Sequence, residues 1–277
     1  MLEGIVGCLP IEIEMNRRPA EVGVGDSLAE WIKEVPLVTK LLVAGTFGTT
    51  FMDFVGICSA NTFTFSSYLI FKKFQLWRLV TPFLYSFGFS PNFFFHIYLL
   101  YENSRRYEMN PFNTGGGGNS ADFLYMILLG MAVMCVIAHF FELTQVVSAL
   151  LYMIMYVWSR KEPDTMVSSF TLQYKAIYSP WISLAIYLVM GNDVTQPLIG
   201  IAVGHVYFFF TSILPVSHEI DIIHTPEFCV SIFRHYTGMN TASTNRPAVN
   251  PPANGAQQAP NLGAGHQWGI GRALGSD

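Results

Sequence analysis

The sequence predicts an all-α polytopic membrane protein with six transmembrane helices and a disordered C-terminal tail. Its 277 residues are 51% hydrophobic but only 12% charged, about half of the roughly 25% charged residues of soluble domains. No Asp, Glu, Lys or Arg occurs in five long stretches, at 79–101, 123–141, 143–159, 176–192 and 194–218. A soluble protein needs charge on its exposed faces, so these stretches exclude an ordinary cytosolic enzyme.

Residues 1–26 are predicted to be a cytosolic N-terminal extension. The first ten residues carry no Lys or Arg, and their short apolar run is followed by Glu12 and Glu14, which is unlike a cleavable signal peptide. Residues 27–35 then predict a short amphipathic helix, because four apolar residues recur at helical spacing: Leu28, Trp31, Ile32 and Val35. Such a helix suits the membrane headgroup interface, and packing on the rest of the protein is the alternative.

Six hydrophobic segments follow, within a membrane domain that we place at residues 27–216. They are 37–60, 83–101, 123–141, 146–158, 179–190 and 197–215. With six spans, both chain ends lie on one side. The opposite side holds only Lys72, Lys73 and Arg78, so twelve of the fifteen Lys and Arg residues lie on the side of the termini. The positive-inside rule therefore predicts that both termini are cytosolic.

The connection at 61–81, on the non-cytosolic side, is too apolar for a hydrated loop and is predicted to lie partly in the membrane interface. Trp77 would anchor it there. Arg78 could donate hydrogen bonds to loop carbonyls and hold the loop in place, with simple anchoring as the alternative. Asp53 either lines a water-filled cavity or lies near this interface, because a charge at the membrane centre costs about 2.5–3.5 kcal/mol.

The fourth and fifth segments are short for a membrane span. Thirteen residues of helix, as in 146–158, cover roughly 20 Å, against a hydrocarbon core of about 27 Å in the endoplasmic reticulum. Two explanations remain open. Either the short helices are screened by their neighbours inside the bundle, or the surrounding bilayer thins and lowers the barrier to moving polar chain across it.

Residues 217–265 are predicted to be a flexible cytosolic linker, because 237–265 are rich in Asn, Ala, Pro, Gly, Gln and Thr and have few large apolar residues. A Trp and a Leu reappear in the final segment, 266–277, as Trp268 and Leu274. At the tip of a flexible tail they have no fold to stabilise, which predicts a short docking motif.

Three histidines lie at membrane depth: His96, His139 and His205. His205 follows Gly200 and Gly204, whose spacing allows two helices to pack closely. A serine paired with such a histidine would make an intramembrane protease.

The fourth segment, 146–158, contains one serine, Ser148, which lies between Val147 and Ala149. The chain has no G-x-S-G motif to expose a nucleophile or form an oxyanion site. No catalytic residue is therefore predicted.

Other kinds of site are not indicated. The four cysteines are scattered and show neither disulfide-scaffold nor metal-binding spacing. A net charge of −4 without a basic stripe indicates no nucleic-acid partner. The glycines at 115–118 lack the strand and Lys-Ser/Thr of a phosphate loop, so we expect no cofactor.

Several motifs, in this order, resemble the Derlin family. They are Pro-Leu-Val-Thr-Lys at 36–40, Trp-Arg-Leu-Val-Thr-Pro-Phe at 77–83, Ala-Asp-Phe-Leu-Tyr-Met at 121–126, Tyr-Ser-Pro-Trp at 178–181 and Gly-x-x-x-Gly-His-x-Tyr-Phe-Phe at 200–209. The C-terminal ending also resembles the SHP box of that family, through Trp268, Gly269, Gly271 and Leu274. Trp268 stands where the general pattern often has Phe. Residues 1–25 have no recognised counterpart.

The resemblance implies a rhomboid-like six-helix fold in the endoplasmic reticulum membrane, without the catalytic serine. It implies a role in endoplasmic-reticulum-associated degradation, in which misfolded proteins are retrotranslocated to the cytosol. The SHP box implies recruitment of the AAA+ ATPase valosin-containing protein. Further expected partners are misfolded client proteins, a ubiquitin ligase complex of the endoplasmic reticulum, the lipid bilayer and other copies or relatives of the chain in an oligomer.

Two other functions are weighed against this one. An active rhomboid protease would be labelled by a covalent serine probe, with the label lost in Ser148→Ala. A channel or transporter would show substrate-dependent conductance, although the membrane segments hold no chain of ionisable residues beyond Asp53 and the histidines.

Overall fold

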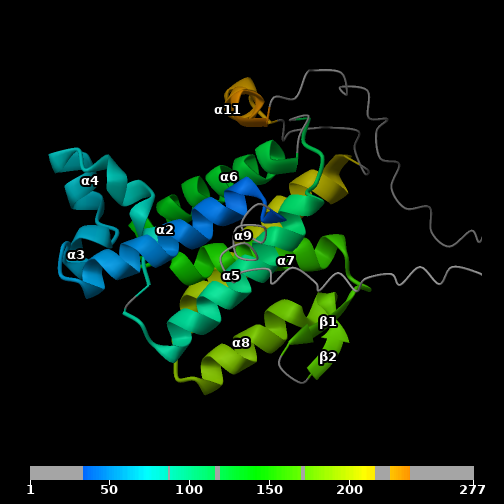
Figure 1. Cartoon of the computed structure of the whole chain (residues 1–277), viewed down its shortest axis with the longest axis horizontal. Helices are drawn as coiled ribbons and strands as arrows, with labels where there is room; N and C mark the ends of the chain where they lie inside the picture. The colour runs from blue at the N-terminus through cyan, green and yellow to red at the C-terminus, as the bar shows by residue number, and fades with distance from the viewer. Residues whose placement is uncertain (1–33, 87, 116–118, 170–171, 216–224, 238–277) are drawn as a thin grey trace, which may run out of the picture. The chain divides into compact units, whose positions relative to one another are not determined.

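The computed structural model describes residues 34–237, except for 87, 116–118, 170–171 and 216–224 (Figure 1). Most of the N-terminal extension and of the amphipathic helix predicted at 27–35 lies outside the described residues. So does the predicted docking motif, 266–277.

The described part of the chain is mostly helical, as predicted, and each predicted hydrophobic segment overlaps one helix (Figure 1). These are α2 (Leu37–Phe54), α5 (Pro91–Met109), α6 (Asn119–Phe140), α7 (Val147–Lys161), α8 (Ser179–Val189) and α9 (Thr195–Phe208). A π-helical turn, η4 (Phe209–Ile213), continues α9.

Two of these helices are long and apolar enough by themselves to cross a membrane. They are Asn119–Phe140, with 22 residues and a mean hydropathy of 2.3, and Thr195–Ile213, with 19 residues and a mean hydropathy of 1.3. The other helices are shorter or carry more charge; α5, for example, ends with Glu102, Arg105, Arg106 and Glu108.

The predicted start of the second segment, at residue 83, is wrong. Phe83 lies in a short 3-10 turn, η2 (Thr81–Phe83), and α5 begins only at Pro91. Ser90 caps the helix by accepting a hydrogen bond from the backbone N–H of Phe93 at 3.3 Å. Pro91 fits the first helical turn, where its missing N–H costs nothing.

Two elements that follow α7, a hairpin and a helix, were not predicted. An antiparallel hairpin of β1 (Met166–Ser169) and β2 (Leu172–Lys175) joins α7 to the 3-10 turn η3 (Ala176–Tyr178), which leads into α8. The second element is α11 (Glu227–Thr237), which falls in the range 217–265 predicted as linker. The linker prediction is wrong there, because the polar composition on which it was based begins only at residue 237.

Helix α7 lies at the centre of the bundle and contacts α5, α6, α8 and α9. Every residue from Val147 to Ser159 is buried. By contrast, α8 lies at the edge of the bundle (Figure 1) and buries only Ser179, Pro180 and Ser183. Screening by neighbouring helices therefore explains the shortness of α7, which is an inner helix, but not that of α8.

The turn between α8 and α9 is closed by Asp193. Its carboxylate accepts hydrogen bonds from the Thr195 hydroxyl at 2.8 Å and the Thr195 backbone N–H at 3.1 Å. These bonds, the hydroxyl first, lower the pKa of Asp193. The carboxylate thereby occupies the N-terminal end of α9, where the helix dipole favours negative charge.

Candidate functional site: the apolar loop and the contact between α7 and α9

The connection predicted to lie in the membrane interface folds into four short helical turns. They are α3 (Ala60–Phe63), α4 (Ser67–Lys73), η1 (Leu76–Leu79) and η2. Phe63, Phe65 and Ile70 are buried beneath them. The inner side of this connection is therefore packed around buried apolar side chains.

Arg78 is buried and binds the inside of this loop. Its Nη1 donates to the carbonyl oxygens of Asn61 at 2.7 Å and Thr64 at 2.6 Å, and its Nε donates to Gln75 Oε1 at 2.7 Å. A guanidinium can serve three acceptors in this way because its donors form a rigid fork. Arg78 therefore ties η1 to the end of α3.

Three further contacts attach the loop to the bundle. The backbone N–H of Phe65 donates to the Thr144 carbonyl at 2.9 Å. The Ser67 hydroxyl is 2.8 Å from His139 Nδ1. Asp53, in the last turn of α2, accepts a 2.6 Å hydrogen bond from the Tyr85 hydroxyl.

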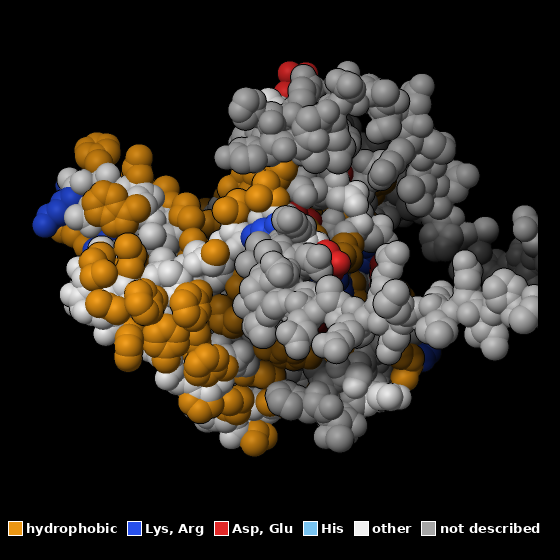
Figure 2. All heavy atoms as spheres, in the orientation of Figure 1, with side chains coloured by type: hydrophobic (Ala, Val, Ile, Leu, Met, Phe, Trp, Pro, Cys, Tyr) orange, Lys and Arg blue, Asp and Glu red, His pale blue; other side chains and the backbone are white. Residues whose placement is uncertain are grey.

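The outer side of the loop is apolar. Figure 2 shows hydrophobic side chains gathered over α3, α4 and the neighbouring end of α2. We call the exposed set on α4 and η1 the apolar loop surface. Its members are Tyr68, Phe71, Phe74, Leu76 and Trp77, with exposed fractions between 51% for Trp77 and 78% for Phe74. A patch of large apolar residues on this scale marks a surface that contacts lipid or another protein.

Gly200 and Gly204 lie where α9 crosses α7. A Cβ at Gly200 would lie 2.1 Å from the carbonyl oxygen of Ala149, and one at Gly204 would lie 3.1 Å from the Met153 carbonyl oxygen. Only glycine allows the two backbones to approach so closely at position 200.

His205 is exposed and does not contact Ser148. Its Nδ1 is 2.7 Å from the Tyr156 hydroxyl, which also accepts from Arg160 Nε at 3.1 Å. Ser148 is two turns earlier on α7, about 12 Å along the helix, and its Oγ is 3.2 Å from the Tyr187 hydroxyl. The structure thus does not bring together the pair that a serine protease would need.

Two buried carboxylates were missed by the sequence analysis. Glu108 of α5 is almost fully buried and accepts from the backbone N–H groups of Val38 at 2.9 Å and Thr39 at 2.7 Å. It also accepts from the Thr39 and Ser120 hydroxyls, both at 2.7 Å. Glu108 therefore caps α2, whose own N-cap residue is Pro36, and joins α5 to the start of α6.

Asp122 of α6 links Thr225, just before α11, to Thr114, in the segment before α6. It accepts hydrogen bonds from the hydroxyls of Thr114 at 2.9 Å and Thr225 at 2.7 Å. The Thr225 backbone N–H donates to the Thr114 carbonyl at 2.7 Å. No spacing in the sequence indicates these pairs, because their members are up to 111 residues apart.

Comparison with known proteins identifies the family of the chain. A sequence profile of the Der1-like family matches residues 35–227. The chain is 31% identical over 207 residues to a probable derlin-2 homolog of Dictyostelium discoideum, covering 72% of this chain and 80% of that protein. It is 30% identical to Derlin-2.2 of Arabidopsis thaliana over 76% of this chain and 89% of the relative. It is 28% identical to Derlin-2 of Oryza sativa subsp. japonica over 92% and 98% of the two chains. The chain is a membrane protein and belongs to the Der1-like, or Derlin, family.

Proposed function

We propose that the chain is a non-catalytic component of endoplasmic-reticulum-associated degradation that helps to retrotranslocate misfolded proteins to the cytosol. The observation that carries this proposal is the match to the Der1-like family over residues 35–227. That family is rhomboid-like and is generally regarded as inactive. In the proposed topology, the bundle spans the endoplasmic reticulum membrane six times with both termini in the cytosol, as the distribution of Lys and Arg favours.

The apolar loop surface is the proposed entry side for clients. Five large apolar side chains point outward from a loop that Arg78 holds together from within. A loop of this kind, inserted into the interface, disturbs lipid packing beside the bundle. A misfolded polypeptide would meet a weakened barrier there and an apolar surface to contact.

The cytosolic tail is the proposed attachment point of the motor. Trp268, Gly269, Gly271 and Leu274 would bind the AAA+ ATPase valosin-containing protein, which then pulls the client outward. The linker before them, beyond α11, would set the reach of this attachment. A ubiquitin ligase complex and further copies or relatives of the chain would complete the assembly.

A pulse-chase experiment tests the proposal. Cells that lack the protein would express a misfolded luminal reporter and be rescued with the full chain, a chain ending at Gly265, or the double variant Trp268→Ala, Leu274→Ala. The matched control changes two tail residues outside the motif, Gln257→Ala and Gln258→Ala. The full chain and the control should restore reporter turnover, whereas the other two should not. Unchanged turnover with every version would refute the degradation role for this reporter, and rescue by the truncated chain would refute the role of the tail.

The role of the loop has its own test. Arg78→Lys keeps the charge but removes the guanidinium that donates the three hydrogen bonds. We therefore expect faster hydrogen exchange across 61–79 and slower reporter turnover. Lys73→Arg, an exposed change in the same loop, is the control and should leave both unchanged. Faster exchange with normal turnover would show that the ordered loop is not used for clients.

The absence of catalysis is tested with a covalent serine probe. We expect no labelling of the full chain in membranes, because Ser148 and His205 each hydrogen-bond to a tyrosine and lie apart. Labelling that disappears in Ser148→Ala, but not in the nearby Ser159→Ala, would identify an active protease instead.

A further inference from the structure

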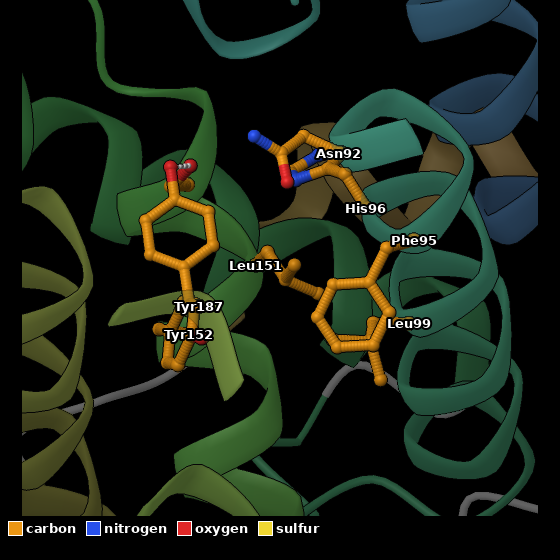
Figure 3. A pocket seen from close by; sticks show the side chains of 8 residues that line it. Asn92, Phe95, His96, Leu99, Leu151, Tyr152 and Tyr187 are labelled. Carbon is orange, nitrogen blue, oxygen red and sulfur yellow. Dashed lines mark hydrogen bonds between the residues drawn. The ribbon is translucent and has the colours of Figure 1, made fainter. Parts of the chain in front are cut away.

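A small cavity lies inside the bundle between α5, α7 and α8 (Figure 3). It is lined by four residues of α5, three of α7 and one of α8, which are Asn92, Phe95, His96 and Leu99, Ser148, Leu151 and Tyr152, and Tyr187. Asn92 and His96 lie together on one side in Figure 3, one helical turn apart on α5, while Tyr152 and Tyr187 lie on the other. The volume of the cavity is about 10 Å³.

Three of the lining side chains carry a buried polar atom without a hydrogen-bond partner among the described residues. These atoms are Asn92 Oδ1, His96 Nε2 and the Tyr152 hydroxyl. His96 is only 7% exposed and Tyr152 only 1%. Two different helices thus present unpaired polar groups to one space.

Such groups are costly to leave unpaired, and more so within a membrane. Lipid tails cannot hydrogen-bond them, so each must find its partner inside the protein. The other polar groups at the cavity are already engaged with one another, since Ser148 Oγ is 3.2 Å from the Tyr187 hydroxyl and Asn92 Nδ2 donates to Asn192 Oδ1 at 2.6 Å. These neighbouring polar groups therefore do not hydrogen-bond to Asn92 Oδ1, His96 Nε2 or the Tyr152 hydroxyl.

We propose that this cavity is a binding site for one buried water molecule, which bridges the polar groups of α5 and α7. The space matches about one water, and two to four polar partners are what a buried water usually has. Water fits the mixed chemistry, because it donates to His96 Nε2 and Asn92 Oδ1 and can accept from the Tyr152 hydroxyl. The site goes beyond the proposed function, since it concerns how α5 and α7 are held together inside the bundle.

Hydroxyl-radical footprinting by X-ray radiolysis tests this proposal, because a bound water generates radicals that oxidise the side chains beside it. The full chain in lipid nanodiscs would be irradiated, and oxidation measured by mass spectrometry. Phe93 is the control: it follows Asn92 on α5, is 1% exposed, and packs among Phe47, Phe89 and Phe94. After correction for intrinsic reactivity, we expect Tyr152 to be oxidised several-fold faster than Phe93.

Equal, slow oxidation of Tyr152 and Phe93 would show a dry cavity and overturn the proposal, and this comparison needs no variant. His96→Leu then tests the partner. It removes one polar group and fills space, so the oxidation of Tyr152 should fall to that of Phe93. Fast oxidation of Tyr152 that persists in a folded His96→Leu protein would overturn the assignment of the water to His96.

Discussion

Helices α7 and α8 are both too short to cross a typical bilayer, yet their surroundings are opposite. They have 15 and 11 residues, or about 22 and 16 Å at 1.5 Å per residue, against a hydrocarbon core of about 30 Å. Neighbouring helices enclose α7 on every side, whereas α8 exposes most of its length. The protein shields α7 from lipid. If α8 spans the membrane, as proposed, the bilayer beside it thins or the ends of α8 are solvated.

The comparison also reverses a rule from soluble proteins. The serines of the exposed helix α8, Ser179 and Ser183, are among the few residues that it buries, and the buried helix α7 contains Ser148, Tyr152, Tyr156 and Ser159. Lipid tails are as apolar as a leucine side chain, so polar groups gain most from being placed between helices, where they find partners. In this bundle, α7 is therefore expected to contribute more to stability than α8, because other helices surround α7.

The largest effect is expected where α9 crosses α7. Gly200→Ala should destabilise the protein by more than about 3 kcal/mol, because its Cβ would collide with the backbone of Ala149, which cannot move aside. Gly48→Ala in α2 is the control: nothing lies within 4 Å of its added Cβ, and a gain of up to about 1 kcal/mol is expected. Thermal unfolding in detergent measures both. A mild effect of Gly200→Ala would mean that α7 and α9 are further apart than described.

A matched pair of leucines compares α7 and α8 directly. Leu151 of α7 is 2% exposed and Leu188 of α8 is 59% exposed. Leu151→Ala should cost about 2–5 kcal/mol by leaving a cavity, and Leu188→Ala should change stability by less than about 0.5 kcal/mol. Equal losses in the same unfolding assay would contradict the central position of α7.

A matched pair of tyrosines gives a smaller effect. Tyr156→Phe in α7 removes a hydroxyl with two partners, His205 and Arg160, and should cost about 1–2 kcal/mol. Tyr187→Phe in α8 removes one hydrogen bond, the 3.2 Å bond to Ser148, and should cost about 0.5–1 kcal/mol. The reverse order would show that α8 is held more firmly than its exposure indicates.

The smallest change in stability is expected from lengthening α8. Four apolar residues inserted between Val189 and Met190 would add about 6 Å of helix at little cost, since this end of α8 is exposed. If a thinned bilayer beside α8 assists retrotranslocation, reporter turnover should slow. A matched insertion of four Gly and Ser residues after Pro251, in the tail, is the control. Normal turnover with the longer α8 would show that its shortness is not used.

Several features of the protein could be read from the sequence because they depend on neighbours along the chain. Charge-free stretches located five of the six helices, hydropathy located α2 in spite of Lys40 and Asp53, and the spacing of Gly200 and Gly204 indicated the close contact of α9. The start of α5 was missed although Ser90-Pro91 is a local signal for it. Residues 79–89 are mostly apolar, so hydropathy places the start of the segment well before Pro91. Helix α11 was missed because the composition that indicated a linker was taken from residue 237 onward, where α11 ends.

The sequence by itself determined the class of the protein, its family and the approximate positions of six helices, since hydropathy, charge and motif order are properties of the chain. Only the tertiary structure decided that α7 is enclosed and α8 is not, that Glu108 caps α2, and that Asn92, His96 and Tyr152 surround one cavity. The physical reason is that lipid and protein interior are equally apolar. An apolar segment therefore has the same composition whether it faces lipid or other helices. The role of a buried polar group depends on hydrogen-bond partners that are distant in sequence.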